Sequence, residues 1–332
     1  MTFFTTILPS AIVIASILLY GCTGEILMEK SGHLNLGVPG VMCIGTFGGC
    51  LGASIFMSNY TSDPYSAPWF GLMMMSLLFS AIFGLFAGLI YAILTVTLKC
   101  NQNVTGLALT IFGAGFADFL MSRIDTTYFA AASKILRYRL PFAETMIKSE
   151  NGFVASLGST FFSYGFLVYL SIIITIIVAV VLKRTRVGLS LRSVGENPAT
   201  ADAAGINVTR YKYGAILIGS VIAGFGGLTY VMENVAGSWE NSTTIQAFGW
   251  LAIALVIFCV WKPILGILGS IVFGFLFILP TFINGINSVQ MKLLNTVPYV
   301  VTIIVLVITS IVGKKSVQPP ASLGQSYFRE DR

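Results

Sequence analysis

The sequence predicts an all-α polytopic membrane protein with about nine to ten transmembrane helices and a short helix in a cytoplasmic loop. Hydrophobic residues make up 56% of the 332 residues and charged residues only 10%. A soluble domain needs more charge than this to hydrate its surface. The apolar residues also form repeated runs that are long enough to cross a bilayer core of roughly 30 Å. Residues 183–212 form the best-marked polar interruption of this pattern.

The first half of the chain contains four apolar runs. Trp69 opens the third run and is expected at the membrane interface, where tryptophan is enriched. The loop before it, residues 59–68, is rich in Ser, Asp, Pro and Tyr and is expected outside the cell. The four predicted helices span residues 3–21, 37–57, 69–98 and 104–121.

Residues 23–35 concentrate polar groups directly after the first apolar run. Glu25, Glu29 and His33 lie at positions i, i+4 and i+8, so a helix would place them on one face. Such a face suits a metal or proton site, and it also suits a solvated surface, which is the commoner case. Polar backbone at membrane depth is tolerated only inside protein or beside a watery cavity. The segment is therefore either a cytoplasmic turn or a broken helix near such a cavity.

A second polar insert covers residues 122–160. Its charge balance is positive, yet counting the spans places it outside the cell. Within it, residues 128–140 predict an interfacial amphipathic helix. Asp118, near the end of the preceding span, is either a functional carboxylate or, as the spacing favours, the partner of Arg123 in an interfacial ion pair.

The second half of the chain predicts five further spans. Between them lie external loops at residues 233–244 and 284–295 and a tight cytoplasmic turn at residues 261–263. These spans cover residues 161–182, 213–232, 245–260, 264–282 and 296–312. The count is nine crossings with the N-terminus outside, or ten with both ends inside if one long segment hides another crossing.

Small residues recur at the four-residue spacing that lets two helices approach closely. We expect these positions to mark the faces where the spans pack on one another. The residues with this spacing are Gly45 and Gly49, Gly84 and Gly88, and Gly219, Ala223 and Gly227.

We name residues 183–212 the coupling loop. Asn197 can cap a helix, Pro198 suits the first helical position, and Gly205 supplies a left-handed stop, so a short helix is predicted over residues 197–204. This Ala-rich helix has too little apolar surface for a core of its own and needs a partner. The flanking Lys and Arg residues place the loop in the cytoplasm. The helix is either a docking element or an ordinary connector.

Three groups of residues resemble a known family. The run Arg192-Ser193-Val194-Gly195-Glu196-Asn197-Pro198, followed by Ala201 to Ile206 and Lys212, resembles the cytoplasmic signature of permease subunits in the branched-chain amino acid and ribose permease superfamily of ABC importers. Residues 24–27, 29–32 and 34–37 resemble the N-terminal motif of its nucleoside and simple-sugar branch. Residues 249–254 and 261–274 are also similar to that branch. One departure is the run Gly37-Val38-Pro39-Gly40, where that branch usually has an acidic residue.

The resemblance implies a transmembrane permease domain at residues 1–315 and a cytoplasmic polar tail at residues 316–332, which we expect to be disordered. Two such subunits would form the pathway in a bacterial cell membrane, two cytoplasmic ATPases would grip the coupling helices, and an extracellular lipoprotein would deliver the substrate. Nucleosides are the implied substrates, with simple sugars as the alternative. The implied ATPase-coupling residues are Gly195, Glu196, Asn197, Pro198, Ala201, Asp202, Ala204 and Gly205. Asn35, Leu36 and Trp250 are the candidates for the translocation path.

The sequence contains no phosphate-binding loop and no nucleophile with its base, so we do not expect an enzyme. We expect no cofactor or metal on this chain, with ATP bound by a partner, and no nucleic acid. An ion-coupled secondary transporter is the remaining alternative. That class predicts ionisable residues near mid-membrane, whereas the middles of these spans are nearly free of charge.

Overall fold

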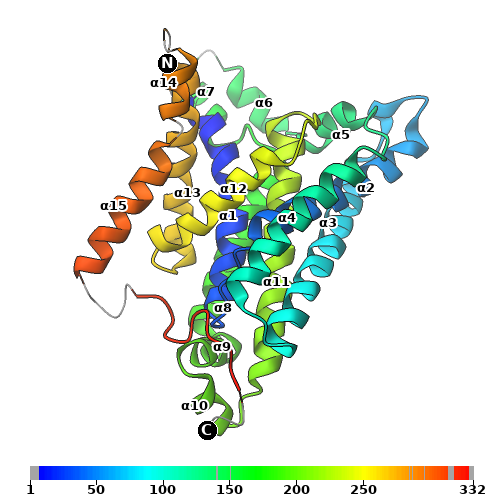
Figure 1. Cartoon of the computed structure of the whole chain (residues 1–332). Coiled ribbons are helices and arrows are strands. Elements are labelled where there is room, and N and C mark those ends of the chain that lie inside the picture. The colour runs from blue at the N-terminus through cyan, green and yellow to red at the C-terminus, as the bar shows by residue number, and fades with distance from the viewer. Residues whose placement is uncertain are drawn as a thin grey trace.

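The computed structural model describes residues 7–139, 141–149, 151–283, 285, 287–294, 296–312 and 318–328. Within these ranges every regular element is helical, and the long helices form a bundle (Figure 1). The helices are α1 (Leu8–Glu29), α2 (Val38–Met57), α3 (Trp69–Ala92), α4 (Gln102–Met121), α5 (Phe129–Leu136), α6 (Pro141–Ile147), α7 (Gly152–Phe161), α8 (Phe166–Arg184), α9 (Arg186–Glu196), α10 (Pro198–Ala203), α11 (Val208–Thr229), α12 (Thr243–Phe258), α13 (Pro263–Ile278), α14 (Ser288–Leu294) and α15 (Val297–Val312).

Seven helices in the described ranges are long and apolar enough to cross a membrane, namely α1, α2, α3, α4, α8, α11 and α13. The helices α12 and α15 have 16 residues each and lie at two further predicted crossings. The predicted class, an all-α polytopic membrane protein, is therefore confirmed.

Three helices form the centre of the bundle. In their most apolar stretches, 89% of the residues of α1 and 78% of those of α2 and α11 are buried, against 33 to 44% for α3, α4, α8 and α13. The outer helices expose large apolar side chains such as Ile82, Ile111 and Leu268. Such surfaces suit contact with lipid tails, because a bilayer does not penalise exposed hydrocarbon.

The central helices cross at glycines, as the four-residue spacing predicts. A Cβ atom on Gly24 of α1 would lie 2.4 Å from the carbonyl oxygen of Gly219 in α11. A Cβ atom on Gly45 of α2 would lie 2.3 Å from the Cα atom of Gly224 in α11. Both distances are far below van der Waals contact. The backbones of α1, α2 and α11 therefore approach one another directly.

The polar inserts gather at opposite ends of the bundle (Figure 1). The helices α9 and α10 lie at one end with residues 318–328, and we name this the docking end. The helices α5, α6 and α7, from the second polar insert, lie at the other end. This arrangement agrees with the span count, which put the two inserts on different sides.

Several boundaries differ from those predicted. Helix α1 continues to Glu29 because its polar residues are buried among neighbouring helices. Helix α11 begins at Val208 inside the coupling loop and is prolonged by a π-helical turn, Tyr230–Asn234. Glu233 was predicted in an external loop, but it lies in this turn, buried, with Arg137 3.8 Å away. The positive charge of Arg137 offsets the cost of burying the Glu233 carboxylate, so this turn can remain buried.

The amphipathic helix predicted at residues 128–140 is present as α5, but it is not interfacial. Its Phe129 and Ala132 side chains have no exposed surface. They pack on the protein, where α5 contacts α2, α3 and the turn after α11. The apolar face is therefore satisfied by protein and not by lipid. The segment predicted to stop transfer, residues 313–315, lies outside the described residues.

We predict that Gly45→Val lowers the thermal unfolding midpoint of the detergent-purified protein, because the added side chain forces α2 away from α11. Overpacking of this kind typically costs about 1–3 kcal/mol. The control is Gly115→Val on α4, where a Cβ atom would meet nothing within 4 Å. Equal melting of the two variants would contradict the close helix crossing.

Candidate functional site

The predicted coupling helix at residues 197–204 is confirmed as α10. The side-chain oxygen of Asn197 accepts from the backbone N–H of Thr200 at 3.0 Å, and Pro198 occupies the first helical turn. Gly205 follows with a φ of +83°, the left-handed conformation that ends a helix. Local capping chemistry alone therefore determines where this helix begins and ends.

Helix α9, directly before α10, was not predicted. Thr185 caps it, since its hydroxyl oxygen accepts from the backbone N–H of Gly188 at 3.1 Å. Val187, Leu191 and Val194 follow at i, i+4 and i+7, and the last two are buried. This cap and this spacing are signals from which α9 could have been found.

A small apolar cluster holds the coupling loop together. Its buried members are Val194 from α9, Ala201 from α10 and Val208 from α11. Helix α10 therefore takes its partner within the chain, from the helices on either side of it. Further side chains that pack on this cluster are Ile206, Tyr211 and Tyr327.

The C-terminal segment, residues 318–328, runs across the docking end (Figure 1). The carbonyl oxygen of Gly195 accepts from the backbone N–H of Ser322 at 3.0 Å and from its hydroxyl at 2.6 Å. The N–H of Gly324 donates to the carbonyl of Gly32 at 3.2 Å. The predicted disorder of the tail is therefore wrong for these residues. The segment has little apolar surface to pack, and hydrogen bonds to backbone carbonyls hold it in place instead.

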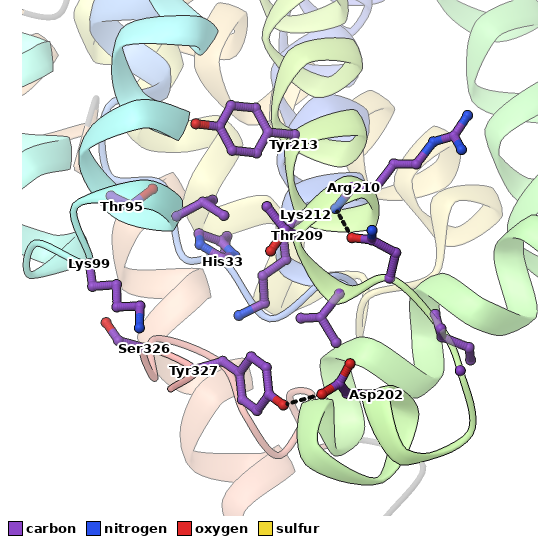
Figure 2. A pocket seen from close by; sticks show the side chains of 15 residues that line it. His33, Thr95, Lys99, Asp202, Thr209, Arg210, Lys212, Tyr213, Ser326 and Tyr327 are labelled. Atoms are coloured by element: carbon purple, nitrogen blue, oxygen red, sulfur yellow. Dashed lines mark hydrogen bonds between the residues drawn. The ribbon is translucent and has the colours of Figure 1, made fainter. Parts of the chain in front are cut away.

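Two side chains of the same segment add further contacts. The hydroxyl of Tyr327 donates to Asp202 of α10 at 2.9 Å (Figure 2). The ammonium of Lys99, after α3, lies 4.2 Å from the centre of the Phe328 ring. The segment thus connects α10 with the transmembrane bundle.

The predicted coupling residues divide into a supporting group and an exposed group. Gly195 and Ala201 are buried, and a Cβ atom on Gly195 would lie 2.3 Å from the carbonyl oxygen of Lys30. These two attach α10 to the bundle and cannot touch a partner directly. Pro198 and Asp202 are half-buried. The residues exposed at the docking end are Glu196, Asn197, Ala204 and Gly205.

The amino-acid sequence that forms this bundle and its exposed α10 matches a described family over most of its length. Residues 7–310 match the family described as "Branched-chain amino acid transport system / permease component". The chain belongs to this family. The permease is therefore a multi-pass membrane protein and a permease component of an ABC transporter.

Three relatives match the permease over nearly its whole length. The nucleoside ABC transporter permease protein NupC of Lactococcus lactis is 30% identical, covering 97% of this chain and 96% of the relative. The guanosine ABC transporter permease protein NupQ of Bacillus subtilis is 31% identical, covering 98% and 97%. A protein of Haloferax volcanii named as a candidate glucose ABC transporter permease, TsgC13, is 28% identical, covering 99% of both chains.

Of the residues predicted for the translocation path, Asn35 and Leu36 lie in the turn between α1 and α2, and Trp250 lies on α12. Asn35 has no exposed surface, and its backbone N–H donates to Glu25 at 2.8 Å. The carbonyl of Leu36 accepts from the hydroxyl of Thr110 at 2.8 Å. Trp250 lies half-buried on α12. Asn35 and Leu36 hold the turn between α1 and α2, and their part in the path stays a prediction.

The interpretation of Glu25, Glu29 and His33 as a solvated face is wrong. Their exposed fractions are 0, 2 and 1%. The indole N–H of Trp261, in the turn before α13, donates to the carboxylate of Glu29. Among the described residues, no group of three His, Cys, Asp or Glu side chains is placed to hold a metal ion. In this chain the carboxylates hold helices together.

The predicted ion pair between Asp118 and Arg123 is also wrong. The two carboxylate oxygens of Asp118 accept from the backbone N–H of Ser242 at 2.8 Å and from its hydroxyl at 2.7 Å. Arg123 lies over the ring of Phe119 at 4.9 Å instead. Asp118 thus fixes the start of α12 against the end of α4, a contact that joins residues 124 positions apart.

We predict that His33 contributes a loss of stability to the permease as the pH falls below about 6.5, the usual pKa of histidine. Burial, with Lys212 nearby, holds the pKa of His33 well below its usual range. The unfolded chain therefore binds the proton first, and the loss is at most about 1.4 kcal/mol per pH unit. His33 is the only histidine in the sequence. Thermal unfolding of the parent and of His33→Phe from pH 8 to pH 5 measures the effect, and the stability of the parent relative to the variant should fall as the pH is lowered. Parallel profiles for the two proteins would refute this assignment.

Proposed function

We propose that the permease forms one half of the pathway of an ATP-driven importer for nucleosides in a bacterial plasma membrane. The observation that carries the proposal is the exposed, capped α10 at one end of a bundle of membrane-spanning helices. The two relatives named for nucleoside or guanosine transport favour this substrate class, because each covers nearly the whole chain. The relative named for glucose favours simple sugars as the second candidate.

The arrangement of the two ends supports a set of partners for this chain. Cytoplasmic ATPase subunits bind ATP and grip the exposed residues of α10, so this chain itself carries no cofactor. A second permease subunit completes the pathway. An extracellular binding lipoprotein docks at the opposite end, where α5, α6 and α7 lie (Figure 1).

The proposed coupling is mechanical. Helix α10 is attached to α11 by the cluster of Val194, Ala201 and Val208. Helix α11 then contacts α1 backbone to backbone at Gly219, where added side-chain atoms would clash. Helix α2 meets α11 in the same way at Gly45, so a movement of the ATPases that displaces α10 moves all three central helices. Packed elements transmit such displacements because close-packed interiors yield little.

We predict that Gly205→Val weakens the coupling of ATP hydrolysis to substrate. No atom lies within 4 Å of a Cβ at this position, so the cost comes from the φ of +83°, roughly 1–2 kcal/mol for a residue with a side chain. Substrate-stimulated ATPase activity of the reconstituted complex should fall. Gly214→Val, in α11, is the control, because space is also free there and the φ is not positive. Full stimulated activity in Gly205→Val would count against docking at α10.

Uptake of radiolabelled nucleosides tests the proposed substrate. Cells that make this chain with its ATPase and receptor should accumulate nucleosides, and an ATPase-dead partner should abolish the uptake. Uptake of ribose or glucose instead would keep the mechanism and change the substrate. Nucleoside uptake that survives the dead ATPase but collapses with the proton gradient would refute the ATP-driven mechanism.

A further inference from the structure

A cavity of about 640 Å³ opens at the docking end of the permease. Four separate segments surround it, namely the coupling loop, the end of α3, the turn between α1 and α2, and residues 318–328. Cavities that bind small ligands in proteins typically measure about 300–1,000 Å³. The cavity therefore has the size of a ligand site, and it lies between α10 and the bundle.

Two nearly buried nitrogen-bearing side chains line this cavity. His33 and Lys212 line it, and their exposed fractions are 1% and 3%. Both ring nitrogens of His33 are buried without a hydrogen-bond partner. Lys212 takes part in no ion pair among the described residues. Buried polar groups in folded proteins nearly always have a hydrogen-bond or ion-pair partner. Within the described part of the chain, His33 and Lys212 have none of these bonds, and a ligand can supply them.

The remaining charges around the cavity leave an excess of positive charge. Lys99 reaches the cavity from the segment that follows α3, opposite Lys212 (Figure 2). The carboxylate of Asp202 already accepts from Tyr327. The guanidinium of Arg210 points away from the cavity (Figure 2). Two ammonium groups and an unpartnered imidazole therefore share a space with one engaged carboxylate.

We propose that this cavity binds a small phosphate monoester, with the phosphate between Lys99, Lys212 and His33. A phosphate dianion offers enough acceptor oxygens for both ammonium groups and for one imidazole N–H, and such charge-assisted bonds are the strong ones. Inorganic phosphate alone would fill a small part of 640 Å³. The rings of Tyr213 and Tyr327 line the same cavity and provide a surface for the organic part.

The position of the site gives the ligand a regulatory effect, and this step rests on the proposed function. A bound phosphate ester would connect Lys212 on α11 with His33 in the α1–α2 turn and with Lys99 after α3. All of these elements belong to the connection through which a displacement of α10 would reach the bundle. The ligand would therefore restrain the coupling loop and slow transport, so that a phosphorylated compound inside the cell limits import.

Equilibrium binding tests the site independently of transport. The purified complex of this chain with its ATPases, in phosphate-free detergent buffer, is titrated with radiolabelled inorganic phosphate and with radiolabelled uridine monophosphate. We expect saturable binding of one monophosphate per copy of the chain, tighter than that of inorganic phosphate. Lys212→Met and Lys99→Met should each weaken binding about tenfold or more, because each removes a charge-assisted bond. Arg210→Met is the matched control and should stay within about twofold of the parent.

The same binding experiment distinguishes a soluble phosphate ester from a lipid headgroup as the ligand. Competition by phosphatidylglycerol vesicles that is lost in both lysine variants would assign the site to a lipid phosphodiester and would overturn the proposal of a phosphate monoester. Lys99 is exposed at the rim, so its variant decides the question even if Lys212→Met fails to fold. No saturable binding of either probe, or unchanged binding in both lysine variants, would overturn the proposal. Binding that persists when nucleoside uptake is absent would overturn the proposed substrate alone.

Discussion

The turn between α1 and α2 is the point on which the docking half of the permease depends. The polar groups of a buried turn are shielded from water, so each of them needs a protein partner. The turn takes these partners from other helices. The carbonyl of Leu34 accepts from the hydroxyl of Tyr91 in α3 at 2.6 Å, and its N–H donates to Gln102 of α4 at 2.9 Å. Because these bonds join four helices at one place, no helix end there can move alone.

The same turn anchors the parts that face the cytoplasmic partners. Its Gly32 carbonyl accepts from Gly324 of the C-terminal segment, and its Lys30 carbonyl leaves no room for a side chain at Gly195 of α9. The segment in turn bonds to Gly195 through Ser322. The coupling loop, the C-terminal segment and the start of α2 therefore form one connected unit. Such a unit can pass a displacement of α10 to the centre of the bundle.

Buried ionisable groups at this end are partly compensated and partly not. Glu29 has the Trp261 indole as donor, and Glu25 has the backbone of Asn35, so each carboxyl contributes to the connection between helices. His33 and Lys212 have no such partner, although burial of an unpaired polar or charged group costs free energy. The permease keeps this cost at the place where the coupling loop meets the bundle. A ligand that bonds to His33 and Lys212 would remove this free-energy cost, because the folded protein has already taken both groups out of water.

The sequence by itself determined the membrane class, the long helices and the bounds of α10, since hydropathy, Asn197, Pro198 and Gly205 act locally. It also indicated the small-residue faces, because helix packing follows four-residue spacing. Only the tertiary structure decided the rest. It decided the burial of Glu25, Glu29 and His33, the partner of Asp118 and the order of residues 318–328. Several of these depend on groups more than a hundred positions away: Asp118 bonds to Ser242, and Glu29 bonds to Trp261. A carboxylate has the same local pattern on a solvated face and in a buried contact, and only the partner that the fold brings to it distinguishes the two.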